Sequence, residues 1–205
     1  MQVPYSVLSQ GRREAFERFG TVFDLPIVRS PYGYLKRSYQ GGLVLDVGAG
    51  ADRYLQQVLG LDDEAYHSLD SDPAGQFTYT DVSQIPSDQQ YQWMVLNQLL
   101  EHLTIEETAD LLFGLHGHLA PGGCMAITVP NVSHPIRYRN ETHVTPWSYG
   151  GLYAICRFAG YEVQQIYRYS KNRGPLDPLS WVMERVMRHL YRIDWCQSIM
   201  LVATR

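Results

Sequence analysis

A short apolar run followed by two glycines is the part of this chain best suited to hold a ligand. The run covers residues 43–47 and leads into Gly48-Ala49-Gly50. Glycines let the backbone turn tightly and approach a ligand closely. Asp70 follows a second apolar stretch, and a carboxylate there could accept hydrogen bonds from two hydroxyl groups at once. The pattern predicts the first strand and loop of a nucleotide-type α/β fold.

Two histidines are candidates for accepting a proton, because imidazole titrates near neutral pH. His102 follows Glu101 just after a predicted strand, and His143 lies in a polar loop after the next predicted strand. His102 could instead buttress the start of the following helix. His143 could organise its loop or position a substrate without any proton transfer.

No metal site is expected from the sequence. His116 and His118 lie two residues apart on a predicted helix and therefore point in different directions. Asp70 and Asp72 could form a carboxylate pair, but no third ligand is evident near them.

Strands and helices alternate along most of the chain, which implies a largely parallel sheet covered on both faces. Strands are expected at residues 43–47, 65–69, 77–80, 91–96, 124–129, 161–169 and 195–203. Helices are expected at residues 9–19 and 53–59, from Thr104, from Thr145 and at 178–191, and residues 30–42 are expected to form a loop. Ligands of such sheets bind outside the carboxyl ends of the strands.

Two of these helices carry a start signal. Thr104 is followed by Glu107 three residues later, which is the spacing of a capping box. Thr145-Pro146 has a residue that favours the N-cap followed by a residue that favours the first helical position.

Composition limits the class of protein. A length of 205 residues suits one domain, which we expect to span residues 41–205 behind an N-terminal cap segment of residues 1–40. The net charge of −4 argues against nucleic-acid binding. No apolar run reaches the roughly 18 residues of a membrane span, and no secretory signal is visible. A cytoplasmic protein is therefore expected, and its oligomeric state cannot be predicted.

Charge is distributed unevenly. From Arg157 onward the chain has eight Lys or Arg and four Asp or Glu, whereas the preceding part is acidic. A solvated helix face explains this most simply, and an anionic substrate is the alternative.

Five stretches, taken in order, resemble the class I S-adenosylmethionine-dependent methyltransferases. The resemblance spans about residues 40 to 170 and rests on Val44-Leu45-Asp46-Val47-Gly48-Ala49-Gly50, Ser68-Leu69-Asp70-Ser71-Asp72-Pro73, Asp81-Val82 with Ile85-Pro86, Leu96-Asn97-Gln98-Leu99-Leu100-Glu101-His102-Leu103 and Leu119-Ala120-Pro121-Gly122-Gly123. Two positions depart from the family pattern. Asp52 stands near a frequent third glycine, and Tyr91-Gln92 stands where an aromatic-Asp pair is common.

The resemblance implies a fold, a cofactor and a set of binding residues. The fold is a doubly wound, mostly parallel seven-stranded α/β sheet of the Rossmann-like methyltransferase type with an N-terminal helical cap, and the cofactor is S-adenosyl-L-methionine. The implied cofactor-binding residues are Asp46, Gly48, Ala49, Gly50, Asp70, Ser71, Asp81, Val82, Asn97 and Gln98.

The family's roles carry over to matching positions. Asp70 would accept hydrogen bonds from the ribose hydroxyls, and Asp81 would reach the adenine amino group beside Val82. Gly48 and Gly50 would pack against the methionine part of the cofactor. Asp46 would meet the methionine amino group or orient the loop, and Asn97 would lie where the strand passes the cofactor.

The resemblance implies methyl transfer to a small-molecule acceptor, and the basic charge balance of the C-terminal part favours a sugar-linked or phosphorylated one. His102 and His143 are then the candidate catalytic residues. Aromatic side chains that could wall an acceptor pocket are Tyr32, Tyr34, Tyr138 and Trp147. A non-catalytic binding protein of the same fold is an alternative. A nicotinamide-dependent oxidoreductase is less favoured, because its fingerprint needs a glycine where this chain has Arg53.

Overall fold

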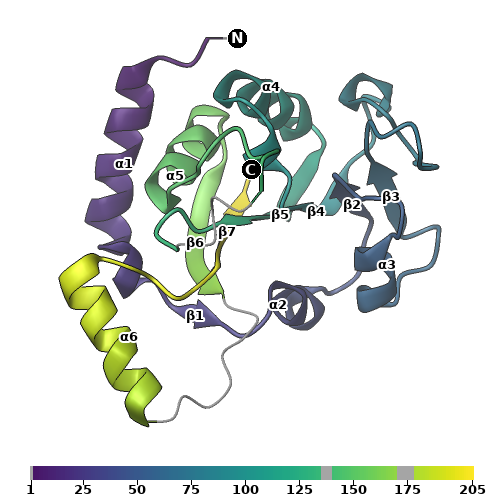
Figure 1. Cartoon of the computed structure of the whole chain (residues 1–205). Coiled ribbons are helices and arrows are strands. Elements are labelled where there is room, and N and C mark those ends of the chain that lie inside the picture. The colour runs from purple at the N-terminus through teal and green to yellow at the C-terminus, as the bar shows by residue number, and fades with distance from the viewer. Residues whose placement is uncertain (1, 135–139, 170–177) are drawn as a thin grey trace.

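The computed structural model describes residues 2–134, 140–169 and 178–205 (Figure 1). Its strands are β1 (Ile27–Val28), β2 (Val44–Val47), β3 (Tyr66–Leu69), β4 (Tyr91–Asn97), β5 (Leu119–Pro130), β6 (Glu162–Tyr169) and β7 (Ser198–Thr204). Its α-helices are α1 (Tyr5–Phe19), α2 (Pro31–Ser38), α3 (Tyr54–Leu59), α4 (Ile105–His116), α5 (Tyr149–Phe158) and α6 (Pro178–Tyr191). Three short 3-10 helices are η1 (Val22–Asp24), η2 (Val82–Gln84) and η3 (Leu100–His102).

The seven strands form one sheet in the order β1-β6-β7-β5-β4-β2-β3. Strand β7 runs antiparallel to its neighbours β5 and β6, and the other paired strands are parallel. The predicted mostly parallel, seven-stranded Rossmann-like sheet with a helix at the N-terminus is therefore confirmed.

The helices cover both faces of the sheet, with α1, α4 and α5 on one face and α2 and α3 on the other (Figure 1). Successive side chains of β4 alternate between the faces, as the pleat of a strand requires. Met94 and Leu96 pack in the larger core with α4 and α5, whereas Trp93 and Val95 pack with α2 and α3. Both faces of the central strands are buried, which explains their continuous apolar sequence.

The capping box at Thr104 is confirmed. The Thr104 side chain accepts a hydrogen bond from the Glu107 backbone N–H at 3.2 Å, and the Glu107 carboxylate accepts one from the Thr104 N–H at 2.8 Å. This reciprocal pair fixes the start of α4 directly behind η3.

The strand predicted at residues 77–80 is wrong, because this segment makes only an isolated bridge between Leu69 and Tyr79. Beside that bridge, side-chain hydroxyl groups take the place of backbone carbonyls as acceptors for the N–H groups of the two segments. The Ser68 N–H donates to Thr78 Oγ1 and the Thr78 N–H donates to Ser68 Oγ, each at 3.1 Å. The seventh strand is β1 instead, which pairs with β6.

The loop predicted at residues 30–42 is also wrong, because it contains α2. Ser30 caps this helix by accepting a hydrogen bond from the Gly33 N–H at 3.1 Å, and Pro31 occupies the first helical position. Proline is favoured there, because the first helical N–H has no partner within the helix.

The helix predicted to start at Thr145 begins at Tyr149, with Ser148 as its N-cap. Thr145 lies three residues before this N-cap, and its hydroxyl donates to the Leu103 carbonyl at 2.6 Å. The residues before α5 are therefore attached to η3 rather than to their own helix.

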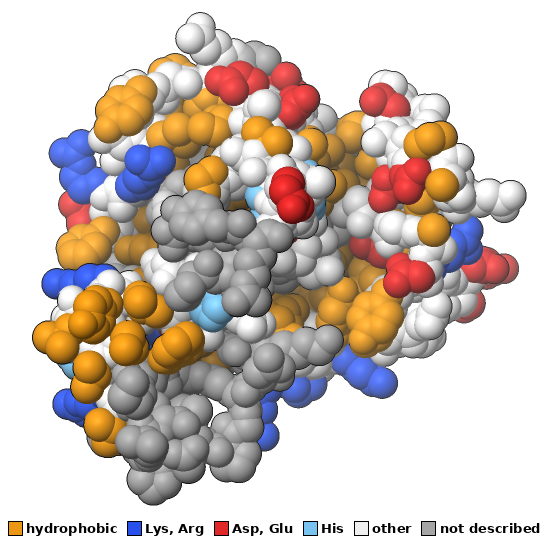
Figure 2. All heavy atoms as spheres, viewed as in Figure 1, with side chains coloured by type: hydrophobic (Ala, Val, Ile, Leu, Met, Phe, Trp, Pro, Cys, Tyr) orange, Lys and Arg blue, Asp and Glu red, His pale blue; other side chains and the backbone are white. Residues whose placement is uncertain are grey.

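The N-terminal segment contributes to the same sheet and core. Helix α1 lies along α5, and β1 forms one edge of the sheet (Figure 1). Among the described helices, none combines the length and the apolar character needed to cross a membrane. Exposed apolar side chains gather over α6 in the space-filling view, among them Val182, Val186 and Leu190 (Figure 2).

Candidate functional site

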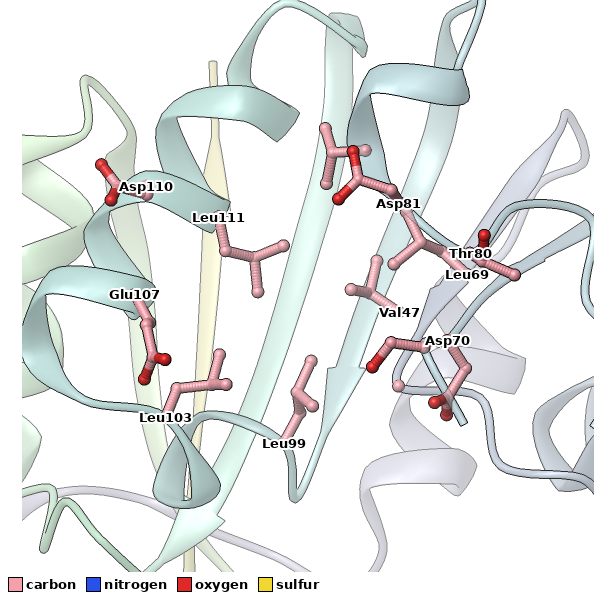
Figure 3. Close-up of a pocket in the computed structure, with 13 residues that line it drawn as sticks. Val47, Leu69, Asp70, Thr80, Asp81, Leu99, Leu103, Glu107, Asp110 and Leu111 are labelled. Atoms are coloured by element: carbon pink, nitrogen blue, oxygen red, sulfur yellow. The ribbon is translucent and has the colours of Figure 1, made fainter. Parts of the chain in front are cut away.

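A cavity of about 410 Å³ lies at the carboxyl ends of β2 and β3, beside α4. Its lining residues are Val47, Gly48, Leu69, Asp70, Ser71, Thr80, Asp81, Val82, Leu99, Leu103, Glu107, Asp110 and Leu111. Leucines from the β4–α4 side face the acidic side chains that follow β3 (Figure 3). The surface is indented between α4 and the β3 side of the molecule (Figure 2). An apolar slot with acidic groups at its rim suits a ligand with a ring and hydroxyl groups.

The glycine turn after β2 forms one end of this cavity. Gly48 has a φ of +73°, and a Cβ atom added there would lie 2.9 Å from Leu99 Cδ1. Gly50 has a φ of +62°, which also favours glycine. The turn therefore depends on glycine both for its backbone conformation and for its close approach to Leu99.

Asp70 joins this turn to the loop that follows β3. Its Oδ2 accepts a hydrogen bond from the Gly50 N–H at 2.9 Å, and its Oδ1 accepts one from the Asp72 N–H at 3.0 Å. A carboxylate has about four acceptor positions, so both oxygens can still accept a hydrogen bond from a ligand hydroxyl. Ser71 is exposed beside it and also lines the cavity.

Asp81 and Val82 lie on the opposite wall of the cavity from α4. Asp81 Oδ1 caps η2 by accepting hydrogen bonds from the N–H of Ser83 at 2.8 Å and from its hydroxyl at 2.5 Å. These bonds hold the pKa of the Asp81 carboxyl below its ordinary value. Asp81 therefore has two features: it caps η2, as an aspartate commonly does, and its carboxylate also lines the cavity.

Five of the predicted cofactor residues do not line this cavity, namely Asp46, Ala49, Gly50, Asn97 and Gln98. Asp46, Asn97 and Gln98 lie at the same edge of the sheet, and Asp46 and Asn97 belong to the face covered by α2. Asp46 is buried and accepts a hydrogen bond from the Tyr66 hydroxyl at 2.8 Å. Burial raises the pKa of the Asp46 carboxyl to about 6. Ala49, between the two glycines, is also buried.

Tyr32 of α2 lies next to Asn97 on this face of the sheet. The Asn97 side-chain amide donates to the Tyr32 hydroxyl at 2.9 Å, and the Thr128 hydroxyl donates to Asn97 Oδ1 at 2.6 Å. Burial and the nearby Asp46 raise the pKa of Tyr32 to about 12. Tyr32 also packs edge-on against Tyr54, with ring centroids 5.1 Å apart. The sequence suggested Tyr32 as an aromatic wall, but it did not indicate this hydrogen-bonded role.

Gln98 takes a left-handed conformation with a φ of +54°. Its backbone N–H donates to the Thr128 carbonyl at 3.0 Å, and its side-chain amide donates to Thr128 Oγ1 at 3.2 Å. The chain turns sharply there and enters η3.

The two candidate catalytic histidines lie together. The rings of His102 and His143 are 5.0 Å apart between centroids and nearly perpendicular, at 79°. Glu101 lies beside them with only 2% of its surface exposed, and burial raises the pKa of its carboxyl to about 7. A separate cavity of about 240 Å³ is lined by Glu101 and His143, with Asn140 and Trp147 among its other residues.

The sequence did not single out Glu101, although it is adjacent to His102. No local pattern marks a glutamate as buried, because its burial depends on the distant segment that carries His143. The other pair of histidines is separated, as expected. His118 Nδ1 lies 2.9 Å from the Gln89 carbonyl oxygen, whereas the His116 ring packs against Tyr161.

Two other aromatic candidates have structural partners. Tyr34 packs against Tyr167, and the buried Trp147 donates from Nε1 to the Leu100 carbonyl at 2.9 Å. Tyr138 lies outside the described residues.

No protein-family model and no curated protein sequence matches this chain. Solved structures do match it over most of its length. An S-adenosylmethionine-dependent methyltransferase from Archaeoglobus fulgidus has a TM-score of 0.64 at 18% identity, covering 98% of this chain and 100% of that one. The glycopeptide N-methyltransferase MtfA, solved with the S-adenosylmethionine analogue sinefungin, has a TM-score of 0.58 at 13% identity, and the match covers 87% of this chain and 99% of that one.

The [4+2]-cyclase SpnF is also similar, with a TM-score of 0.59 at 15% identity, covering 84% of this chain and 77% of that one. At these identities the comparisons establish the architecture. The chain has the class I S-adenosylmethionine-dependent methyltransferase fold.

Proposed function

We propose that this protein transfers a methyl group from S-adenosylmethionine to a small-molecule acceptor. The observation that carries the proposal is the cavity at the carboxyl ends of β2 and β3, which combines the glycine turn with the carboxylates of Asp70 and Asp81. Ligands of open α/β sheets bind at this edge. The fold shared with several methyltransferases supports the same assignment.

The residues of the cavity fit the parts of this cofactor. Its volume of about 410 Å³ lies within the usual range for small-molecule sites. The leucines on the α4 side offer an apolar surface for the adenine ring, and Asp81 offers an acceptor for its amino group. Asp70 offers acceptor positions for the ribose hydroxyls, from a carboxylate already oriented by two backbone N–H groups.

The methionine end of the cofactor would extend toward Asp46 and Asn97, on the α2 side of the glycine turn. A positively charged amino group near Asp46 would favour the ionised form of this buried carboxyl. Tyr32 would then close this end of the site from α2, because its hydroxyl is held by Asn97.

S-adenosylmethionine supplies a methyl group already activated on a sulfonium when it is bound. The chain must therefore mainly align the acceptor and receive its proton where the acceptor carries one. His102 and His143 are the candidates for these tasks. Neither histidine lines the cofactor cavity, because Leu99 and Leu103 on either side of η3 line that cavity whereas Glu101 and His143 line the smaller one.

The charge balance of the C-terminal part gives little support to a phosphorylated acceptor. Arg168 is buried and pairs with Asp194 at 3.1 Å, and Arg188 packs over the Phe23 ring. Arg205 donates to the Gly117 and Leu119 carbonyls. These cations are used within the chain, so we propose a small-molecule acceptor without assigning its charge.

A protein of this fold that does not transfer a methyl group is the second candidate. The similarity to a cyclase supports it, because the same architecture occurs there with a different named activity. The two candidates separate when an acceptor panel is tested for formation of S-adenosylhomocysteine.

Isothermal titration calorimetry with S-adenosylhomocysteine tests the cofactor assignment directly. We expect one site per chain, and no binding of NAD under the same conditions. Binding of NAD without binding of S-adenosylhomocysteine would reject the proposal in favour of an oxidoreductase. Binding of S-adenosylhomocysteine with no product from any acceptor would favour the non-methylating candidate.

A further inference from the structure

The side chains of Glu101, His102 and His143 form a cluster of three potential metal ligands. One ligand atom from each residue lies within 4.8 Å of the other two. Glu101 and His102 belong to η3, whereas His143 lies in the segment that leads toward α5. The cluster therefore depends on how firmly this segment is attached to η3.

Several hydrogen bonds clamp the two segments together. The N–H groups of Val144 and Thr145 both donate to the Glu101 carbonyl, at 2.8 and 3.1 Å. The Thr145 hydroxyl donates to the Leu103 carbonyl, and the Trp147 indole N–H donates to the Leu100 carbonyl. His143 is adjacent to these anchored residues, so its approach to Glu101 is set by backbone geometry rather than by a flexible side chain alone.

The hydrogen bonds of His102 determine which ring nitrogen is available. His102 Nδ1 lies 3.2 Å from the Thr142 carbonyl oxygen and 3.0 Å from Thr142 Oγ1. The carbonyl can only accept, and the Thr142 hydroxyl already donates its hydrogen to Asn140 Oδ1 at 2.7 Å. Nδ1 must therefore carry the hydrogen, which assigns the lone pair to Nε2. A metal-binding histidine commonly has its other nitrogen fixed in this way.

Glu101 supplies the second observation. Its carboxylate is buried, and Oε2 has no hydrogen-bond partner among the described residues. A buried carboxylate oxygen without a partner is costly, and buried charged groups in proteins are usually paired or bound to metals. The same carboxylate contributes one oxygen to the cluster, and Glu101 lines the same cavity as His143.

We propose that Glu101, His102 and His143 bind one divalent first-row transition-metal ion. Two imidazoles with one carboxylate suit ions such as Zn²⁺, whereas Mg²⁺ and Ca²⁺ prefer a shell of oxygen atoms. Three protein ligands beside a cavity leave coordination positions for a substrate, as in catalytic rather than structural metal sites. A role in holding an oxygen atom of the methyl acceptor rests on the proposed function, but the metal site itself does not.

Calorimetric titration of the tag-free, metal-stripped protein with Zn²⁺ tests the site without any cofactor present. We expect one Zn²⁺ per chain, and Mg²⁺ binding at least about tenfold weaker. Removing a direct ligand should cost at least as much as the roughly 10- to 100-fold loss seen when an outer partner of a ligand is removed. We therefore expect weakening in that range or beyond for His143→Ala and for the nearly isosteric Glu101→Gln. The matched control is His189→Ala, which removes an exposed imidazole from α6.

The wild-type measurement alone can overturn the proposal, because failure to bind one Zn²⁺ per chain would reject the site. Equal binding by wild type and Glu101→Gln would also reject it, since that change preserves the shape of the side chain. Circular dichroism verifies that each variant is folded. S-adenosylhomocysteine affinity should be unchanged in the Glu101 and His143 variants, because neither residue lines the larger cavity. A failed cofactor assignment is thereby distinguished from a failed metal site.

Discussion

The carboxylate of Asp70 accepts a hydrogen bond from the backbone N–H of Gly50 at 2.9 Å, so the loops that follow β2 and β3 are joined into one unit. This contact places an acidic side chain beside the glycine turn at the rim of the cavity. It also means that Asp70 would both shape the site and bind a ligand.

Replacing Asp70 should therefore weaken cofactor binding. We expect Asp70→Ala to reduce S-adenosylhomocysteine affinity by about tenfold or more, because ribose hydroxyls would lose their acceptor, at a cost of about 1–3 kcal/mol. The neighbouring Asp72→Ala is the matched control, since Asp72 does not line the cavity. Calorimetry on both variants measures the difference, and equal affinities would show that Asp70 is not the ribose acceptor.

Replacing Gly48 tests the close approach of the turn to Leu99. Gly48→Ala combines a strained φ of +73° with a Cβ atom 2.9 Å from Leu99 Cδ1, whereas Gly60→Ala combines a φ of +68° with open space. The left-handed conformation alone costs roughly 1–2 kcal/mol. Overpacking should make Gly48→Ala less stable by about 1–3 kcal/mol more. Urea denaturation measures both losses, and equal values would show that Leu99 moves aside freely.

The buried Asp46 should make stability depend on pH in an unusual direction. Burial raises its pKa from 3.8 to about 6, so the folded state favours the protonated form. Ionisation of Asp46 therefore costs stability as the pH rises from about 4 to about 6, and the cost is constant above that range. The stability of Asp46→Asn relative to wild type should therefore rise over this interval, by roughly 2–3 kcal/mol in the free energy of unfolding for a shift of about two pKa units.

Urea denaturation at several pH values between 4 and 7 measures this gain. Asp81→Asn provides the contrast, because the hydrogen bonds from Ser83 lower the pKa of Asp81 and its stability difference from wild type should stay nearly constant over this interval. Asp81 stabilises the fold above its unfolded pKa, and this contribution is lost as the pH falls through its folded pKa. A pH-independent difference between Asp46→Asn and wild type would contradict the assigned burial effect.

The ion pair between Arg168 and Asp194 should be important for stability rather than for substrate binding. Both side chains are buried, and Arg168 also donates to the carbonyls of Leu25 and Phe23. Arg168→Met should destabilise the protein by about 3–5 kcal/mol, because it leaves the Asp194 charge buried without its partner. Arg157→Met, at an exposed position, is the control. A loss below about 1 kcal/mol in urea denaturation would show that the hydrogen bonds from Asn131 and the Cys196 N–H are sufficient for the buried Asp194.

The sequence itself determined most of the central sheet. The runs at residues 43–47 and 91–96 are mostly apolar on both faces, which is typical of strands covered by helices on each side. The capping box at Thr104 and the glycine turn after β2 are also local signals, since each depends on residues within a few positions of one another. These short-range preferences were sufficient to predict the fold class and the edge of the sheet at which a ligand would bind.

Tertiary structure decided the features that depend on distant partners. Strand β1 has only two residues and exists because β6 offers an edge for pairing. The pairing of the 77–80 segment stops at one bridge because Ser68 and Thr78 exchange side-chain hydrogen bonds. The acidic residues near strand ends look alike in sequence, but Asp70 faces the cavity whereas Asp46 is buried against Tyr66. Glu101 and His143 meet because backbone hydrogen bonds join two separate segments, and no local pattern encodes that contact.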